Sequence, residues 1–127
     1  MRPNGMHRLL ALALLLTACG PDETISGYAA EGAIYRLDSI DDMDFAATAT
    51  ITFGADGTVG GNGPCNTYST TQTAPYPWFA LDPIASARRA CPDLDAETTF
   101  FTALAEMTLS EVGGDVLILS NDAGREM

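Results

Sequence analysis

Alternation of apolar and polar residues predicts the clearest strand of the chain. Residues 48–53 alternate between threonine and an apolar residue, so one face of the predicted strand is apolar. Residues 33–40 alternate less regularly and predict an earlier strand. Residues 54–57 end in Asp-Gly, a hairpin signal, and residues 58–61 predict the returning strand. The apolar face of the central strand is expected to contain Ala49, Ile51 and Phe53.

One segment has helical rather than strand periodicity. Residues 93–107 follow Pro92 and carry acidic residues in the first turn, which favours the positive end of a helix dipole. Residues 115–120 then predict a short buried strand. Many short strands with one amphipathic helix favour an α+β domain with an antiparallel sheet. The expected buried stripe of the helix is Leu94, Thr98, Phe101, Leu104 and Ala105, flanked by Phe100 and Met107.

The N-terminus has the pattern of an export signal. Residues 1–18 carry two arginines, no acid and an apolar run that is too short to cross a hydrocarbon core of ~30 Å. The sequence Leu-Thr-Ala-Cys at residues 16–19 resembles the bacterial lipobox, which implies lipidation of Cys19 and cleavage before it. The alternatives are an ordinary signal peptide with an incidental Cys19 and an uncleaved anchor. Residues 19–32 are predicted to be a flexible tether and residues 33–127 a domain.

The location follows from the same resemblance. Lipidation of Cys19, with an added N-terminal acyl chain, would hold the protein on a membrane. Gly20, rather than Asp, follows Cys19. By resemblance to the enterobacterial sorting rule, this favours the periplasmic face of the outer membrane.

Charge and composition exclude several classes of function. After removal of residues 1–18, the chain contains four arginines and seventeen acidic residues, which gives a net charge of −13. This disfavours nucleic acid as a partner, because binding phosphates needs clustered cations. The chain has no lysine, and its single histidine is His7, so a P-loop, a Schiff-base site and a catalytic triad are excluded from the mature chain. We therefore expect a non-enzymatic protein with no cofactor and no metal site.

Two cysteines remain once Cys19 is set aside. In an oxidising compartment, Cys65 and Cys91 predict a structural disulfide. It would close a loop of about 27 residues and contribute roughly 3 kcal/mol by the loss of chain entropy in the unfolded state. Free thiols and an active thiol pair are the alternatives, and no Cys-x-x-Cys spacing supports the latter.

Several segments together resemble the META domain family, the family of the heat-shock-associated lipoprotein HslJ. Residues 63–68, Gly-Pro-Cys-Asn-Thr-Tyr, resemble its first cysteine segment, and residues 84–92 resemble its second, which leads into a helix. Residues 35–37, Tyr-Arg-Leu, resemble its first strand. Pro64 stands where the family usually has glycine. The resemblance covers residues 33–127 and implies a partly open, barrel-like antiparallel sheet with a packed helix. It also implies an envelope location and an association with stress, but no catalytic residues.

Candidate binding residues lie in and between the two cysteine segments. Each has a structural alternative: a side chain that holds its loop, an ion-pair partner of nearby acids, or a core aromatic. The acidic residues 41, 42 and 44 are interpreted as a solvated loop, with a hard cation as the alternative. The candidate binding residues are Asn66, Tyr68, Trp78, Arg88 and Arg89.

The leading hypothesis is a lipid-anchored envelope protein that acts as a binding or assembly module in envelope stress. Its acidity predicts a protein partner with a basic patch and salt-sensitive association. The alternative is a small periplasmic inhibitor of a hydrolase that inserts residues 66–77 into its target. An enzyme that uses carboxylates alone is a third and weaker alternative.

Overall fold

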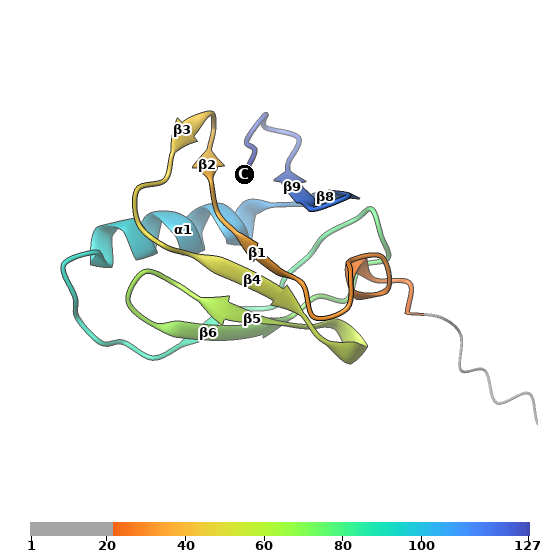
Figure 1. The fold of residues 1–127 in the computed structure, drawn as a ribbon, viewed down its shortest axis with the longest axis horizontal. Helices are drawn as coiled ribbons and strands as arrows, with labels where there is room; N and C mark the ends of the chain where they lie inside the picture. The colour runs from red at the N-terminus through yellow and green to blue at the C-terminus, as the bar shows by residue number, and fades with distance from the viewer. Residues whose placement is uncertain (1–21) are drawn as a thin grey trace, which may run out of the picture.

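A five-stranded antiparallel sheet is the centre of the computed structural model, which describes residues 22–127. The strand order is β1–β4–β5–β6–β7, so β1 and β7 form its two edges (Figure 1). The longest ladder joins β5 to β6 and pairs Gly60 with Ser69. The strands are β1 (Ile34–Arg36), β4 (Thr50–Phe53), β5 (Thr58–Asn62), β6 (Thr67–Thr71) and β7 (Ala85–Ser86).

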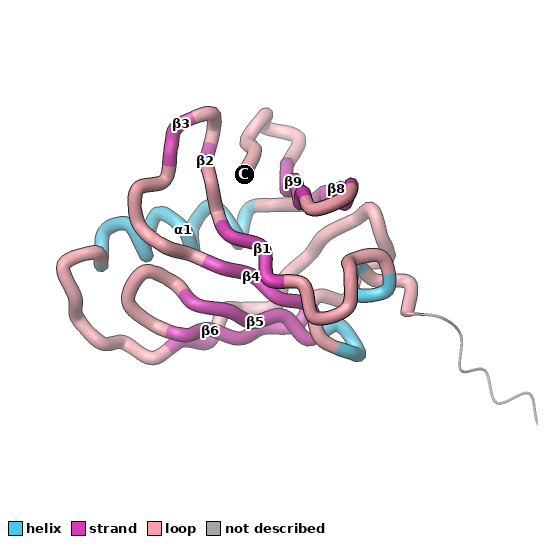
Figure 2. The backbone as a smooth tube through the Cα atoms, viewed as in Figure 1, coloured by secondary structure: helices cyan, strands magenta, loops and turns pink. Residues whose placement is uncertain are grey.

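Two separate hairpins and one α-helix complete the domain (Figure 2). Two short 3-10 turns, η1 and η2, lie before β1 and before β5. The sheet is open rather than closed, which confirms the predicted α+β class with a partly open antiparallel sheet. These elements are η1 (Ile25–Gly27), β2 (Ser39–Ile40), β3 (Met43–Asp44), η2 (Ala55–Gly57), α1 (Leu94–Glu106), β8 (Leu109–Gly113) and β9 (Val116–Ser120).

Helix α1 packs on the sheet, but its buried face differs from the predicted one. Phe100 and Leu104 are buried, whereas Leu94 is 43% exposed and Phe101 is half-buried. The adjacent phenylalanines allow two helix phases about 100° apart. Both rings contact Tyr68, with centroids 5.6 Å away for Phe100 and 5.4 Å away for Phe101, but only Phe100 is fully buried against the sheet. The predicted stripe was therefore wrong in phase. The buried residues of the helix are Glu97, Phe100, Ala103 and Leu104.

The polar segment after Asn66 forms strand β6, not a loop. Its burial alternates, with Tyr68 and Thr70 turned inward, and it pairs with β5 on one side and β7 on the other. The Thr70 hydroxyl donates to the Asp82 carbonyl at 2.8 Å, which satisfies its buried oxygen. A strand held on both sides cannot insert into a target enzyme, so the inserting loop predicted over residues 66–77 was wrong for its first half.

The segment expected to be a flexible tether packs on the domain from residue 22 onward. Ile25 is fully buried in the core, and Thr24 caps η1. The Tyr76 amide donates to the Glu23 carbonyl at 2.7 Å. Part of the predicted tether, within residues 22–32, therefore belongs to the packed core. Strand β8 was also not predicted.

The predicted turn between β4 and β5 is confirmed and depends on Gly57. Its φ is 76°, in the left-handed region that favours glycine, and Asp56 precedes it at φ 58°. The Gln72 amide donates to the Gly57 carbonyl at 2.7 Å. A Cβ atom on Gly57 would lie 2.2 Å from the Gln72 carbonyl oxygen. The turn can therefore approach β6 this closely only with glycine at position 57.

We expect Gly57→Ala to lower the free energy of unfolding by at least about 3 kcal/mol, from backbone strain and overpacking together. Gly114→Ala is the matched control, because Gly114 has φ 57° and a Cβ atom there would have no neighbour within 4 Å. Gly114→Ala should lower the free energy of unfolding only by the backbone strain, about 1 kcal/mol. Urea unfolding of both variants measures the difference. Equal losses would contradict the role of the close approach to Gln72.

Candidate functional site

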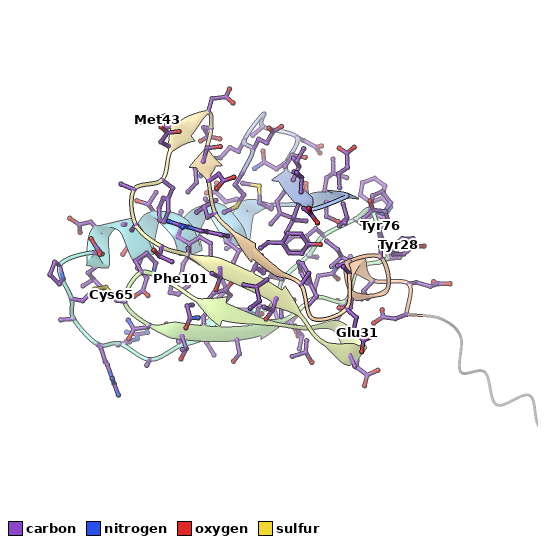
Figure 3. All side chains as sticks on the ribbon, in the orientation of Figure 1. Tyr28, Glu31, Met43, Cys65, Tyr76 and Phe101 are labelled. Atoms are coloured by element: carbon purple, nitrogen blue, oxygen red, sulfur yellow. A yellow bond between two sulfur atoms is a disulfide. The ribbon has the colours of Figure 1, made fainter. Side chains whose placement is uncertain are left out.

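A disulfide joins the two cysteine segments. Cys65 and Cys91 are bonded, with their Cα atoms 5.8 Å apart, which confirms the predicted pairing. The bond connects the turn between β5 and β6 to the residues that precede α1. Figure 3 shows Cys65 and Phe101 on the same side of the molecule. The two segments that carry the candidate residues are therefore covalently held together.

Glu97 is the buried centre of this region. Its side chain is only 4% exposed, although it belongs to the first turn of α1. One carboxyl oxygen, Oε1, accepts hydrogen bonds from the amides of Cys65 at 3.2 Å and Asn66 at 2.7 Å. The other, Oε2, accepts from Asn66 Nδ2 at 2.7 Å. A Cβ on Gly63 would lie 2.6 Å from Oε1, so glycine leaves room for the carboxyl group.

Asn66 extends the network to the second cysteine segment. Its Nδ2 also donates to the Arg89 carbonyl at 3.1 Å, and the Arg89 amide donates to Asn66 Oδ1 at 2.9 Å. The Asn66 side chain is 5% exposed. Each polar atom of its amide group has a protein partner, so Asn66 holds the loop, which is the structural alternative of the sequence interpretation.

The other candidates are not gathered into one site. Tyr68 is 5% exposed, and its hydroxyl donates to the Thr50 carbonyl at 2.7 Å, so its ring belongs to the core. Burial raises the pKa of Tyr68. Arg88 and Arg89 are exposed, and within residues 22–127 neither forms an ion pair. Trp78 is 58% exposed, whereas its neighbour Phe79 fills the core.

A groove of about 190 Å³ lies between β1 and β9 and over α1. The Tyr35 hydroxyl, from one of the lining residues, is buried and has no hydrogen-bond partner among the described residues. Charged residues at the groove are Arg36, Asp38 and Glu126. Its apolar lining includes Tyr35, Leu37, Phe100, Leu104, Leu117 and Leu119.

Both strands beside the groove present backbone groups to it. The Leu37 amide donates to the Ala49 carbonyl on the β4 side, so by antiparallel alternation the amide and carbonyl of Arg36 face the opposite side. Leu119 exchanges two hydrogen bonds with Met127, at 2.9 and 2.8 Å. The backbone amide and carbonyl of Leu117 point the same way as those of Leu119. No strand within residues 22–127 pairs with these two groups of Leu117. The groove thus has a backbone edge along each wall.

An ion-pair cluster holds the C-terminal segment beside this groove. Arg125 contacts Asp41 at 3.0 Å and Glu106 at 2.7 Å. The Glu126 amide donates to Asp41 Oδ1 at 3.1 Å. The hydrogen bond from the Glu126 amide is the largest cause that holds the pKa of Asp41 below its usual value, and the hydrogen bond from Arg125 is the next largest. The cluster therefore fixes the end of the chain to the β2–β3 hairpin and to the end of α1.

Sequence reasoning missed Glu97 and the groove. Glu97 lies three residues before Phe100 and seven before Leu104, so its position on the apolar stripe was the available signal. No group of three or more metal-binding side chains occurs among residues 22–127. Asp41 and Asp42 form the β2–β3 turn, and Asp44 belongs to β3. Cys19 lies outside the described residues. The described chain also has no helix long and apolar enough to span a bilayer.

We expect Glu97→Gln to lower the free energy of unfolding by about 2 kcal/mol, because an amide NH₂ would replace one of the oxygens that accept from Asn66 or its loop. Asp95→Asn is the control: Asp95 is exposed in the same helical turn, and its loss should cost about 0.5 kcal/mol. Urea unfolding with the disulfide intact measures both. Additive effects of Glu97→Gln and Asn66→Ala in a double-mutant cycle would contradict the network.

We expect Arg125→Gln to raise the pKa of Asp41 part of the way to its usual value, since the Glu126 amide still donates to it. Because the pKa is lowered in the folded state, the Asp41 contribution to stability is present above the unfolded value of 3.8 and is lost as the pH falls through the folded value. NMR titration of the Asp41 carboxyl carbon tests this. Arg88→Gln is the control. Arg88 does not belong to the ion-pair cluster, so this substitution should leave the titration of Asp41 unchanged.

Comparison with known proteins identifies the family. The family model described as META domain matches residues 30–127, which include both cysteine segments, α1 and the groove. Searches of curated proteins and of solved structures return no match to the chain. The match covers more than half of the sequence and agrees with the open antiparallel sheet and the single packed helix. The chain therefore belongs to the META domain family.

Proposed function

We propose that this protein is a lipid-anchored protein of the bacterial envelope that binds an extended segment of a partner protein in the groove between β1 and β9. It acts by binding and not by catalysis. Such binding serves envelope assembly under stress, the role that the family resemblance suggests. The anchor is Cys19, and the rigid domain presents the groove close to the membrane.

The two backbone edges of the groove carry this proposal. A peptide that adds to a sheet edge gains main-chain hydrogen bonds, and alternate side chains enter apolar pockets. Here Arg36 and Leu117 present the backbone groups, and the lining between them is mainly apolar. A cavity of about 190 Å³ is smaller than the ~300–1,000 Å³ that drug-sized ligands use, which favours a chain segment over a cofactor.

The surface charge narrows the class of partner. The mature chain carries a net charge of −13. A partner with a basic patch would therefore associate faster than a neutral one, and the association would depend strongly on salt. The inhibitor alternative is less favoured, because β6 occupies much of the first half of the segment that was expected to insert.

The proposal is tested by photo-crosslinking in living cells, with a benzophenone amino acid at Glu126, an exposed residue at the groove. The control position is Thr99 on the exposed side of α1. We expect a crosslinked partner from position 126 and not from position 99. Intact mass of the mature protein tests the anchor, and a mass without acyl groups would refute it.

A second pair of variants tests recognition through the backbone. Arg36→Pro removes an amide that faces the groove and leaves the β4 ladder intact, whereas Arg36→Ala keeps that amide. We expect the proline variant to lower the crosslinking yield roughly tenfold, which corresponds to one lost hydrogen bond, and the alanine variant to have little effect. An unchanged yield in Arg36→Pro, or equal crosslinking from positions 126 and 99, would overturn the groove as the binding site.

A further inference from the structure

A pair of tyrosines lies where the described chain begins. The rings of Tyr28 and Tyr76 are stacked, with centroids 4.3 Å apart and planes 18° apart. Figure 3 shows them side by side at the end of the molecule where residue 22 enters the domain. Trp78 follows two residues after Tyr76 and is 58% exposed, and Tyr28 is 57% exposed. These three residues, Tyr28, Tyr76 and Trp78, are called the aromatic end.

The aromatic end is held in place by the backbone. The Tyr76 amide donates to Glu23, and the Tyr76 hydroxyl accepts from the Val112 amide at 3.1 Å. The Ser110 amide donates to the Pro77 carbonyl at 2.7 Å, and Trp78 forms a β-bridge with Leu109. The core does not need Trp78, because Phe79 fills it. The exposed rings are therefore presented by a fixed segment.

The charges around the aromatic end indicate which lipid headgroups it could contact. Residues 22–35 contain three acids and no arginine, and residues 72–81 contain no charged residue at all. Without cations, this surface has no attraction for anionic headgroups. Tryptophan and tyrosine do, however, concentrate at the boundary between bilayer and water, where the ring is buried and its polar atom stays hydrated.

The length of the connection to Cys19 places the aromatic end at the membrane. Glu23, whose carbonyl is bonded to Tyr76, is the fourth residue after Cys19. Four residues span at most about 14 Å. A lipid on Cys19 would therefore hold the Glu23 backbone, and the Tyr76 amide bonded to it, within about that distance of the lipidated residue. This step rests on the lipid anchor proposed above.

We propose that the aromatic end is a membrane-contact surface, whose Tyr28 and Trp78 rings insert among the headgroups of a bilayer of neutral, zwitterionic lipids. The anchor alone would let the domain rotate freely about its attachment. A second contact through a rigid aromatic end fixes one face of the domain toward the lipid.

Trp78 is the only tryptophan in the chain, so its fluorescence reports on this contact directly. The acylated mature protein is reconstituted into phosphatidylcholine vesicles, with and without lipids brominated near the headgroup. We expect a blue-shifted emission, quenching by the brominated lipids and loss of quenching by aqueous acrylamide. Tyr28→Ser should reduce the quenching by brominated lipid, because it removes the other exposed ring of the aromatic end.

The matched control moves the probe to the far side of the domain. In Trp78→Phe combined with Thr99→Trp, the single tryptophan lies on the exposed side of α1 and should remain accessible to acrylamide and insensitive to brominated lipid. Circular dichroism checks that each variant is folded. Equal behaviour of the probe at positions 78 and 99 would overturn the membrane contact.

Flotation of the vesicles separates this proposal from that of the anchor. A wild-type protein that does not float with vesicles refutes the anchor. A protein that floats, while Trp78 stays open to acrylamide, keeps the anchor and refutes the membrane contact. Protection of Trp78 in native membranes but not in protein-free vesicles also refutes it, since the aromatic end would then contact a protein.

Discussion

Glu97 directs a carboxyl group into the interior, where the turn between β5 and β6 closes around it. Burying such a group is costly unless hydrogen bonds replace the lost water, and here three donors do so. The Asn66 side chain in turn forms two hydrogen bonds with the backbone of Arg89 and so connects Glu97 to the second cysteine segment. One side chain of α1 thus connects the two cysteine segments through hydrogen bonds, and the disulfide joins the same two segments.

This constraint divides the domain into a fixed half and an open half. Around Glu97 the sheet, the helix and the disulfide leave few polar groups without a partner. On the other side, β1 and β9 flank the groove without a strand between them. The Asp41–Arg125–Glu106 cluster fastens only the end of the chain there. A binding surface in the open half can vary its contacts while the fixed half maintains the fold.

The sequence predicted those features that depend on local signals. The alternation around Ala49 and Ile51 and the Asp-Gly turn each have a short-range cause, and both were predicted correctly. The disulfide, between cysteines 26 residues apart, was predicted from the number of cysteines and the expected compartment. The register of α1 was not predicted correctly, because Phe100 and Phe101 offer two phases and only the sheet chooses between them. Strand β6 consists of threonine, serine and tyrosine, a composition that is equally typical of a loop. Asn66 was recognised, but its partner Glu97 was one acid among seventeen until the fold placed it.

The open edge at β1 also bears on how these molecules behave when concentrated. A strand with free amides and carbonyls can pair with the same strand of another copy, which is how soluble domains begin to aggregate. Here the edge is only three residues long, and the exposed Arg36 lies at its end, followed by the charged Asp38. Two such edges brought together would have to strip water from these charges, which opposes the pairing. A short charged strand can thus remain free for a chosen partner while its own copies are kept apart.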